Sequence, residues 1–221
     1  MSDSNSSFKK RVLLILKQLK SNLPSTSPSI LPIWDQGKVI ANLRVISFAS
    51  VRNKNEIKLM ALWRKRNSRW FPAIFRVTLK GTKRWAHSQL LEMPERILFM
   101  VEDLSGREIG HMGLYRFNFS DKSCEIDNVI RGKMLVPGVM TLALKTLINW
   151  SYSVLQVKNL YLRVFSDNKK AISFYERCGF KEIEKIPLQK KKEGATIRWK
   201  ECPPENKTKA ERYFLRMKFA S

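Results

Sequence analysis

Three short apolar segments follow one another near the middle of the chain, at residues 96–102, 108–117 and 123–130. Only turns separate them, at residues 103–106 and 120–122, and these are too short to hold a crossover helix. Each segment has the length and the content of apolar and β-branched residues that strands prefer. The segments therefore predict an antiparallel meander at the centre of the fold.

Helical and strand patterns surround this meander. Apolar residues at helical spacing predict helices at residues 56–66, 82–93, 138–154 and 169–178. Further strands are predicted at residues 39–48, 159–164, 180–186 and 213–219. Together the patterns predict an α/β (α+β) domain with a central mixed, mostly antiparallel sheet of about seven strands, flanked by helices.

The first 37 residues have a different character from the rest. Residues 8–19 combine apolar positions at helical spacing with lysines and an arginine, which predicts a basic amphipathic helix. Residues 21–32 contain three prolines and four serines and are predicted to form a linker. We therefore divide the chain into an N-terminal segment, 1–37, and a domain, 38–221. The helix either docks on the domain or lies on a membrane surface.

Charge is the unusual property of the composition. The chain has 42 Lys and Arg against 19 Asp and Glu, a net charge of +23 and a pI near 10.2. Such a field attracts nucleic acid, anionic lipid headgroups or a phosphorylated ligand, and it argues against a polyamine substrate. No apolar run reaches the roughly 20 residues that a transmembrane helix requires.

The cysteines and histidines indicate the compartment and the absence of a metal site. The three cysteines are widely spaced and odd in number, which favours reduced thiols and a cytoplasmic location. With only two histidines and no CxxC pair, the chain is not expected to hold a structural zinc ion.

Two segments carry a chemical signal. Residues 129–144 read VIRGKMLVPGVMTLAL, a strand that runs through a glycine-containing loop into a helix. Free backbone N–H groups at the positive end of such a helix suit a pyrophosphate, and Gly138 permits a close backbone approach. Residues 168–180 read NKKAISFYERCGF, in which Asn168 begins a helix and Gly179 ends it in the left-handed conformation.

These two segments resemble the GNAT acetyltransferase superfamily. Its cofactor loop has the form R/Q-x-x-G-x-G/A, and its later helix often reads N-x-x-A-x-x-F/L-Y-E-x-x-G-F. The second motif matches at every key position, whereas in the first Met140 replaces the second glycine and the loop is about four residues longer than usual. The resemblance covers roughly residues 38–219 and implies an acetyl-CoA cofactor, held where strands 123–130 and 159–164 splay apart.

The resemblance also assigns roles to residues. Asn128 to Ile130 would pair with the pantetheine arm, the backbone from Gly138 to Leu142 would hold the pyrophosphate, and Asn168 would lie near the thioester. The residues expected to contact the cofactor are Asn128, Val129, Ile130, Arg131, Gly132, Gly138, Val139, Met140, Thr141, Leu142, Asn168, Ala171 and Phe174. A backbone N–H near Val129 would stabilise the oxyanion, and Tyr175 would protonate the departing thiolate.

The general base has three candidates. Glu125 and Asp127 lie on one face of their strand by the period-2 rule, and His111 lies in the middle of the preceding strand. Any of them could remove the proton of an ammonium substrate, directly or through a water molecule. The alternative for each is an ordinary role on a solvated strand face or in the core.

The acceptor is inferred from the first helix and the segment after it. The stretch WRKRNSRWF looks like the corresponding helix of GNAT enzymes that acetylate nucleotide-linked amino sugars, because aromatic rings and arginines suit a stacked base and a phosphate. The residues expected to bind the acceptor are Trp63, Arg64, Arg66, Arg69, Trp70 and Phe71. Three alternatives stay open: a protein or peptide amine, as in ribosomal-protein acetyltransferases; a non-catalytic module that binds nucleic acid or membrane; and transfer of a different acyl group.

Overall fold

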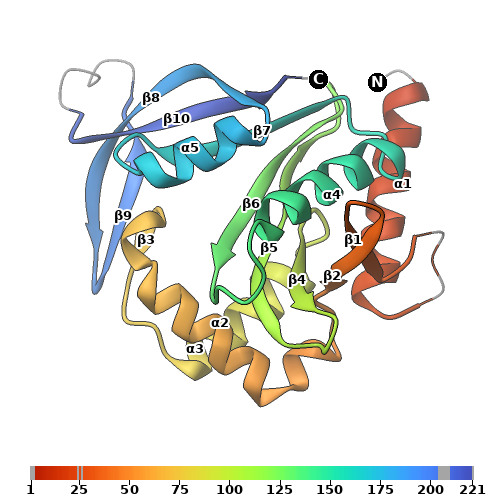
Figure 1. Ribbon diagram of the computed structural model, residues 1–221. Coiled ribbons are helices and arrows are strands. Elements are labelled where there is room, and N and C mark those ends of the chain that lie inside the picture. Colours follow the sequence, from red (N-terminus) through yellow and green to blue (C-terminus); the bar gives the residue numbers. More distant parts are fainter. Residues whose placement is uncertain (1–2, 24, 26, 204–209, 221) are drawn as a thin grey trace.

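The computed structural model describes residues 3–23, 25, 27–203 and 210–220 (Figure 1). Its helices are α1 (Asp3–Lys20), α2 (Lys54–Arg66), α3 (Leu79–Trp85), α4 (Val139–Ser153) and α5 (Lys169–Arg177), with short helical turns η1 (Ser50–Arg52), η2 (Ser68–Trp70) and η3 (Ala86–Leu91). Its strands are β1 (Ile30–Asp35), β2 (Lys38–Val45), β3 (Ala73–Ile74), β4 (Ile97–Asp103), β5 (Glu108–Asn118), β6 (Ser123–Arg131), β7 (Asn159–Phe165), β8 (Phe180–Glu193), β9 (Thr196–Glu201) and β10 (Arg212–Phe219).

The strands form one mixed sheet in the order β1-β2-β4-β5-β6-β7-β10-β8-β9-β3. The predicted meander is β4, β5 and β6, and the β6–β7 pair is parallel whereas the other pairs are antiparallel. The α/β prediction is confirmed. The described sheet has ten strands rather than about seven, because β1, β3 and β9 extend it at its two ends.

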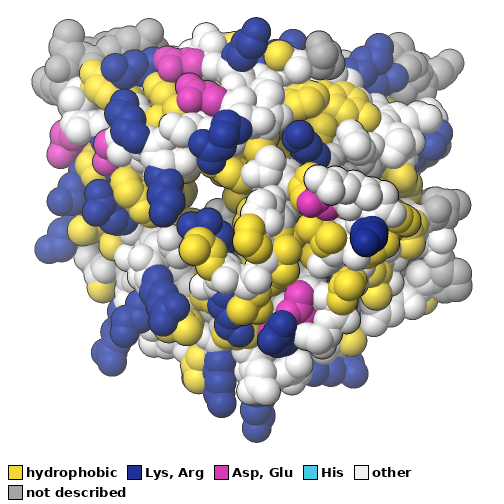
Figure 2. Space-filling view, viewed as in Figure 1, with side chains coloured by type: hydrophobic (Ala, Val, Ile, Leu, Met, Phe, Trp, Pro, Cys, Tyr) yellow, Lys and Arg dark blue, Asp and Glu magenta, His cyan; other side chains and the backbone are white. Residues whose placement is uncertain are grey.

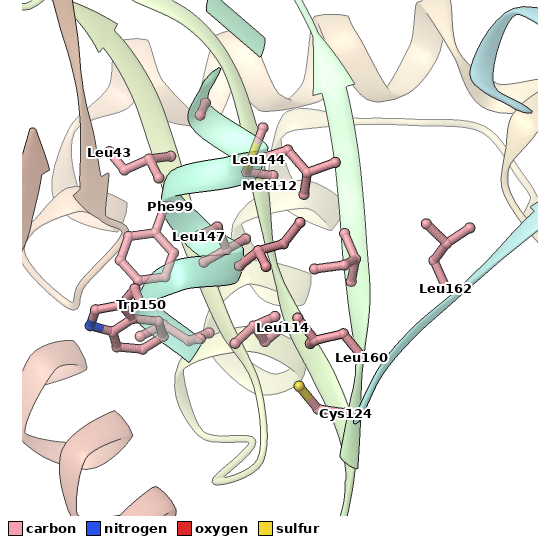
Figure 3. Packing of buried hydrophobic residues seen from close by; sticks show 14 of the residues in the cluster. Leu43, Phe99, Met112, Leu114, Cys124, Leu144, Leu147, Trp150, Leu160 and Leu162 are labelled. Atoms are coloured by element: carbon pink, nitrogen blue, oxygen red, sulfur yellow. The ribbon is translucent and has the colours of Figure 1, made fainter. Parts of the chain in front are cut away.

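Helices cover both faces of the sheet (Figure 1). One core cluster joins α1 and α4 to one face, and a second joins α2 and η3 to the opposite face. In the first cluster the rings of Phe99 and Trp150 pack edge to face with centroids 5.2 Å apart, beside Leu147 and Leu114 (Figure 3). Apolar residues recur along α4 at helical spacing, so its inner face fills the space above the meander.

Helix α1 docks on the domain. Its inner residues Val12 and Leu16 are fully buried in the same core as α4 and the meander. The docked interpretation is therefore confirmed, and the alternative of a membrane-surface helix has no free apolar face to support it. None of the described helices combines the length and the apolar character that crossing a bilayer requires.

The linker prediction is wrong for residues 30–32. These residues begin β1, which pairs with β2 in antiparallel register and buries Leu31 and Ile33. Exposed and buried residues alternate along this strand: Ile30 and Pro32 are exposed, whereas Leu31 and Ile33 are buried. The sequence does not show this alternation, because all four residues are apolar and prolines and serines surround them. The N-terminal segment 1–37 thus contributes a helix to the core and a strand to the edge of the sheet.

Replacing Leu16 with alanine is expected to lower the free energy of unfolding by about 2–5 kcal/mol, because it leaves a cavity in the core. Leu14 lies on the same helix with an exposed fraction of 56%. The matched variant Leu14→Ala is expected to change that free energy by less than about 0.5 kcal/mol. Urea denaturation followed by circular dichroism measures both, and equal effects would contradict the docking of α1.

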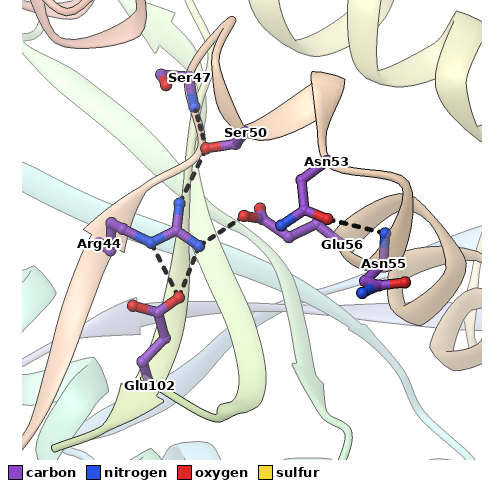
Figure 4. Close-up of polar contacts among 7 residues, drawn as sticks. All are labelled: Arg44, Ser47, Ser50, Asn53, Asn55, Glu56 and Glu102. Atoms are coloured by element: carbon purple, nitrogen blue, oxygen red, sulfur yellow. Dashed lines mark hydrogen bonds and ion pairs between the residues drawn. The ribbon is translucent and has the colours of Figure 1, made fainter. Parts of the chain in front are cut away.

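An ion-pair network fixes α2 against the sheet (Figure 4). Arg44 on β2 donates to Glu102 on β4 at 2.6 and 2.9 Å and to Glu56 on α2 at 3.0 Å. The Arg44 guanidinium also donates to the Ser50 hydroxyl at 2.9 Å, and Asn53 caps the helix start by accepting the N–H of Asn55. The network thereby joins β2, β4 and the N-terminus of α2. Helix α2 also lines the cavity described below.

The predicted helix at residues 82–93 begins earlier and changes its winding. Thr78 caps α3 by accepting the N–H of Gly81 at 3.0 Å, and from Ala86 to Leu91 the chain is a π-helix. The buried Lys20 at the end of α1 donates to the carbonyl groups of Leu90 and Met93. The last carbonyl groups of a helix have no N–H donor within the helix. The Lys20 ammonium supplies donors to two of them at the end of the π-helix.

Candidate active site

Strands β6 and β7 separate along their length. They pair only from Ser123 to Glu125 with Asn159 to Tyr161, and beyond this point they splay apart, as predicted. The register between β5 and β6 shifts opposite Asn128, whose φ of +50° is left-handed. A bulge of this kind redirects the following backbone and side chains of a strand, which is common beside active sites.

A cavity of about 1250 Å³ occupies the splay and the space between α2, α3, α5 and β9. It brings together most of the residues that the sequence singled out. Those that line it are Arg64, Trp70, Phe71, His111, Glu125, Asp127, Asn128, Val129, Ile130, Arg131, Met140, Asn168, Ala171, Phe174 and Tyr175. The remaining ones, which do not line it, are Trp63, Arg66, Arg69, Gly132, Gly138, Val139, Thr141 and Leu142.

The N-terminus of α4 lies beside this cavity through Met140. Gly138 precedes the helix with φ of +73°, and a Cβ there would have no atom within 4 Å. Among the described residues, no acceptor takes the N–H groups of Gly138, Val139 and Met140. The N–H groups of Thr141 and Leu142 donate instead to the Gly138 carbonyl, so the first helical turn removes these two from the predicted pyrophosphate site.

Helix α5 presents the second motif to the cavity. Asn168 caps it by accepting the N–H of Ala171 at 3.3 Å, and Gly179 ends it with φ of +95°. Tyr175 is partly buried between the rings of Phe174 and Phe180, with centroids 5.2 and 6.1 Å away. Burial raises the pKa of the Tyr175 hydroxyl above its usual value, which itself lies above neutral pH, and the group is protonated at pH 7.

His111 is buried and holds the bulge of β6. Its Nδ1 lies 2.8 Å from the carbonyl oxygen of Asn128, and because a carbonyl only accepts, Nδ1 carries the proton. Burial lowers the pKa of His111 to about 4. The imidazole is therefore neutral at pH 7, and its place against Asn128 indicates a positioning role more than that of a base.

His111 is expected to make stability depend on pH. Its pKa of about 4 in the folded state lies below the ordinary 6.5, so the unfolded chain binds the proton first. The contribution of His111 is present above pH 6.5 and is lost as the pH falls towards 4, by about 3 kcal/mol. Urea denaturation at pH 7, 5.5 and 4.5 measures this loss.

The exposed His87 supplies the control for that measurement. His111→Gln should show a smaller loss of unfolding free energy between pH 7 and pH 4.5 than the parent, whereas His87→Gln should show the parent's loss. Equal pH dependence in the parent and in His111→Gln would contradict a buried neutral imidazole.

Each of the two candidate carboxylates has an arginine partner. Asp127 accepts from Arg96 at 2.6 and 2.8 Å, and Glu125 lies 3.1 Å from Arg163 and 3.6 Å from Arg116. Burial raises the pKa of Glu125, and Arg116 opposes this effect. A raised pKa makes the Glu125 carboxylate a stronger base than an ordinary exposed glutamate.

Sequence reasoning missed these arginines. On β7 the core-facing residues are Leu160, Leu162 and Val164, so the period-2 rule places Arg163 on the cavity side. Arg116 has a φ of +53° at a second register shift, which the sequence does not reveal. Arg96 stacks on Tyr115, with its guanidinium carbon 4.5 Å from the ring centroid.

The predicted acceptor residues divide into two groups. Arg64 lines the cavity, stacks 3.8 Å from the centroid of Phe71 and donates to the Ala73 carbonyl. Trp63 is buried at 1% exposure because its indole fills the space beside Gly132, where a Cβ would lie 2.0 Å from the ring. Trp63 therefore lies in the core and outside the cavity lining, and Gly132 has a packing role.

Arg66 and Arg69 are exposed outside the cavity. The side of α2 that carries Arg66 points to solvent, and Arg69 stacks on Trp70 with its guanidinium carbon 4.3 Å from the ring centroid. The structure therefore moves these two from the cavity wall to the outer surface.

A family model described as an acetyltransferase (GNAT) domain matches residues 46–181. The match covers more than half of the chain, which therefore belongs to the GNAT acetyltransferase family. Acetyltransferases of this family use acetyl-CoA as the acetyl donor. The splayed strands, the open helix N-terminus and the adjoining cavity are the parts that such a cofactor requires.

Two curated proteins are similar to part of the chain. A spermidine N(1)-acetyltransferase of Vibrio cholerae is 31% identical over 84 residues, 38% of this chain and 49% of the relative. Its counterpart from Escherichia coli K12 is 32% identical over 82 residues, 37% of this chain and 44% of the relative. The chain thus spans about half the length of the curated relatives it matches.

Solved structures extend the likeness over most of the chain. A mutant of spermidine N-acetyltransferase from Vibrio cholerae superposes with a TM-score of 0.59 at 17% identity, over 81% of this chain and 92% of that one. A dodecameric structure of the Vibrio cholerae enzyme gives a TM-score of 0.57 at 17% identity, over 81% and 92%. At these identities the likeness shows the fold.

Proposed function

We propose that the chain is an acetyl-CoA-dependent N-acetyltransferase whose acceptor is the primary amine of a nucleotide-linked amino sugar. The observation that carries the catalytic part is the junction of the splayed strands with α4. There the N–H groups of Gly138, Val139 and Met140 have no acceptor within the described part of the chain, and open space adjoins Gly138. A pyrophosphate fits this arrangement, since it satisfies the N–H groups at the positive end of the helix.

The chemistry follows from the groups around the cavity. Bound acetyl-CoA supplies an acetyl thioester, which a neutral amine attacks directly. Glu125 takes the proton of the incoming ammonium, and a backbone N–H at Val129 beside the bulge stabilises the developing oxyanion. The Tyr175 hydroxyl is protonated at neutral pH and gives its proton to the departing sulfur as the C–S bond breaks, and the second proton that the nitrogen loses as the amide forms returns to Tyr175.

The charges around the cavity favour an anionic acceptor. Basic side chains outnumber acidic ones in its lining, and all three acidic side chains, Glu125, Asp127 and Glu201, pair with arginines. The basic residues are Arg64, Arg96, Arg116, Arg131, Arg163, Lys170, Arg177, Arg198 and Lys200. A polycationic acceptor would find in this lining only carboxylates that already pair with arginines. The phosphate groups of a phosphorylated amine would be attracted by the excess of basic side chains.

Spermidine is the second candidate, because the curated relatives are spermidine acetyltransferases. Acetyl-CoA-dependent thiol release with a UDP-linked amino sugar, with spermidine and with a basic peptide distinguishes the classes. We expect turnover of the nucleotide sugar. Turnover of spermidine or of the peptide alone would overturn the acceptor, and bound acetyl-CoA without turnover of any amine would overturn the enzymatic function.

A further inference from the structure

The outer surface of α2, η2 and α3 carries an unusually high positive charge. Residues 54–84 contain ten lysines and arginines and a single acidic residue, Glu56. That glutamate is buried and paired with Arg44, so it neutralises nothing at the surface. We call the α2–α3 surface the exposed cations Lys58, Lys65, Arg66, Arg69, Arg76, Lys80, Lys83 and Arg84.

Among the described residues, these cations have no carboxylate partner at ion-pair distance. Some arginines elsewhere on the molecule, such as Arg107, Arg198 and Arg212, are paired with a carboxylate. A dense set of unpaired cations produces a strong local potential that a polyanion would neutralise.

A second basic wall faces the same opening. The tip of the β8–β9 hairpin exposes Lys190, Lys191 and Lys192. The hairpin reaches the segment after α2 where β3 pairs with β9. Other residues of α2, α3 and β9 line the cavity beside these cations. Figure 2 shows Lys and Arg side chains along the left and lower left of the molecule, on both sides of a hollow.

Aromatic rings lie among the cations. Arg69 stacks on Trp70, and Phe75 has an exposed fraction of 41%. Nucleic-acid bases stack on such rings, whatever their sequence, while phosphates bind the neighbouring cations. A lipid surface fits less well, because the apolar face of α2, including Ile57 and Met60, is buried in the core and cannot insert.

We propose that the α2–α3 surface binds single-stranded nucleic acid through its phosphate backbone, beside the mouth of the cavity. This inference is independent of the acceptor proposed above. It places the polyanion on one surface of the molecule, and not on its basic surface as a whole.

The test compares two variants of equal charge. One replaces Lys65, Arg76, Lys80 and Lys83 of the α2–α3 surface with glutamine, and the other replaces Lys9, Lys10, Arg11 and Lys17 on α1. Each removes three lysines and one arginine, and none of the eight lines the cavity. Urea denaturation and acetyl-CoA binding establish that both variants remain folded.

Fluorescence anisotropy of a labelled 20-nucleotide oligouridylate measures binding between 50 and 200 mM NaCl. We expect the parent to bind in a salt-dependent manner and the α1 variant to lose less than about threefold in affinity. The α2–α3 variant should lose tenfold or more at 100 mM NaCl, and the slope of its log affinity against log salt should fall by up to about 3.

Three results would overturn the proposal. The first is an absence of binding by the parent. The second is an equal loss in both variants, which would assign binding to the overall charge. The third is a loss of binding to phosphatidylserine vesicles, but not to oligouridylate, in the α2–α3 variant, which would assign the surface to a membrane.

Discussion

Replacing Tyr175 with phenylalanine is expected to lower kcat by about a hundredfold or more while leaving the affinity for acetyl-CoA within about twofold. Tyr175 lines the cavity, and its hydroxyl is protonated at neutral pH. The phenylalanine ring preserves the packing against Phe174 and Phe180, so only the proton donor is lost. Pre-steady-state thiol release, measured with the acceptor that turns over fastest, reports the chemical step.

Tyr161 provides the matched control for this change. It lies on β7 outside the cavity lining, beneath the guanidinium of Arg216. Tyr161→Phe should therefore keep kcat within about twofold of the parent. If Tyr175→Phe also does so, the proton reaches the sulfur from another source, and Tyr175 is an aromatic packing residue.

Much of the fold could be predicted from local patterns. The meander and the elements that follow it carry their periods plainly, and the predicted bounds of α4, β7 and α5 agree with the structure to within about two residues. The edge strands β1 and β3 could not be predicted in this way. Residues 30–35 lie among prolines and serines, and the two residues of β3 form a strand only because β9 lies beside them.

The candidate site was predictable where a motif fixes the backbone. Asn168 and Tyr175 line the cavity because one short helix and its cap place both. Trp63 was misplaced because an aromatic side chain on a helix packs inward or outward according to its neighbours, and the space beside Gly132 is known only from the fold. The arginine partners of Glu125 and Asp127 come from other elements, so no local pattern reports them.

A second large effect is expected at the start of α4. Replacing Gly138 with valine should weaken acetyl-CoA binding by about a hundredfold or more. The isopropyl group fills the open space next to the N–H groups of Val139 and Met140 and displaces the pyrophosphate from them. Losing two charge-assisted hydrogen bonds of about 1.5–3 kcal/mol each accounts for this change. Isothermal titration calorimetry with acetyl-CoA measures it.

Valine at a left-handed position also strains the backbone. The same substitution at Gly37 is the control that distinguishes this strain from a direct effect on cofactor binding. Gly37 has φ of +78° against +73° for Gly138, and a Cβ has no neighbour within 4 Å at either position. Gly37→Val should therefore cost a similar 1–3 kcal/mol of unfolding free energy while binding acetyl-CoA like the parent. If Gly138→Val and Gly37→Val bind acetyl-CoA with equal affinity, the phosphates do not lie at the start of α4, because blocking that position then has no effect beyond backbone strain.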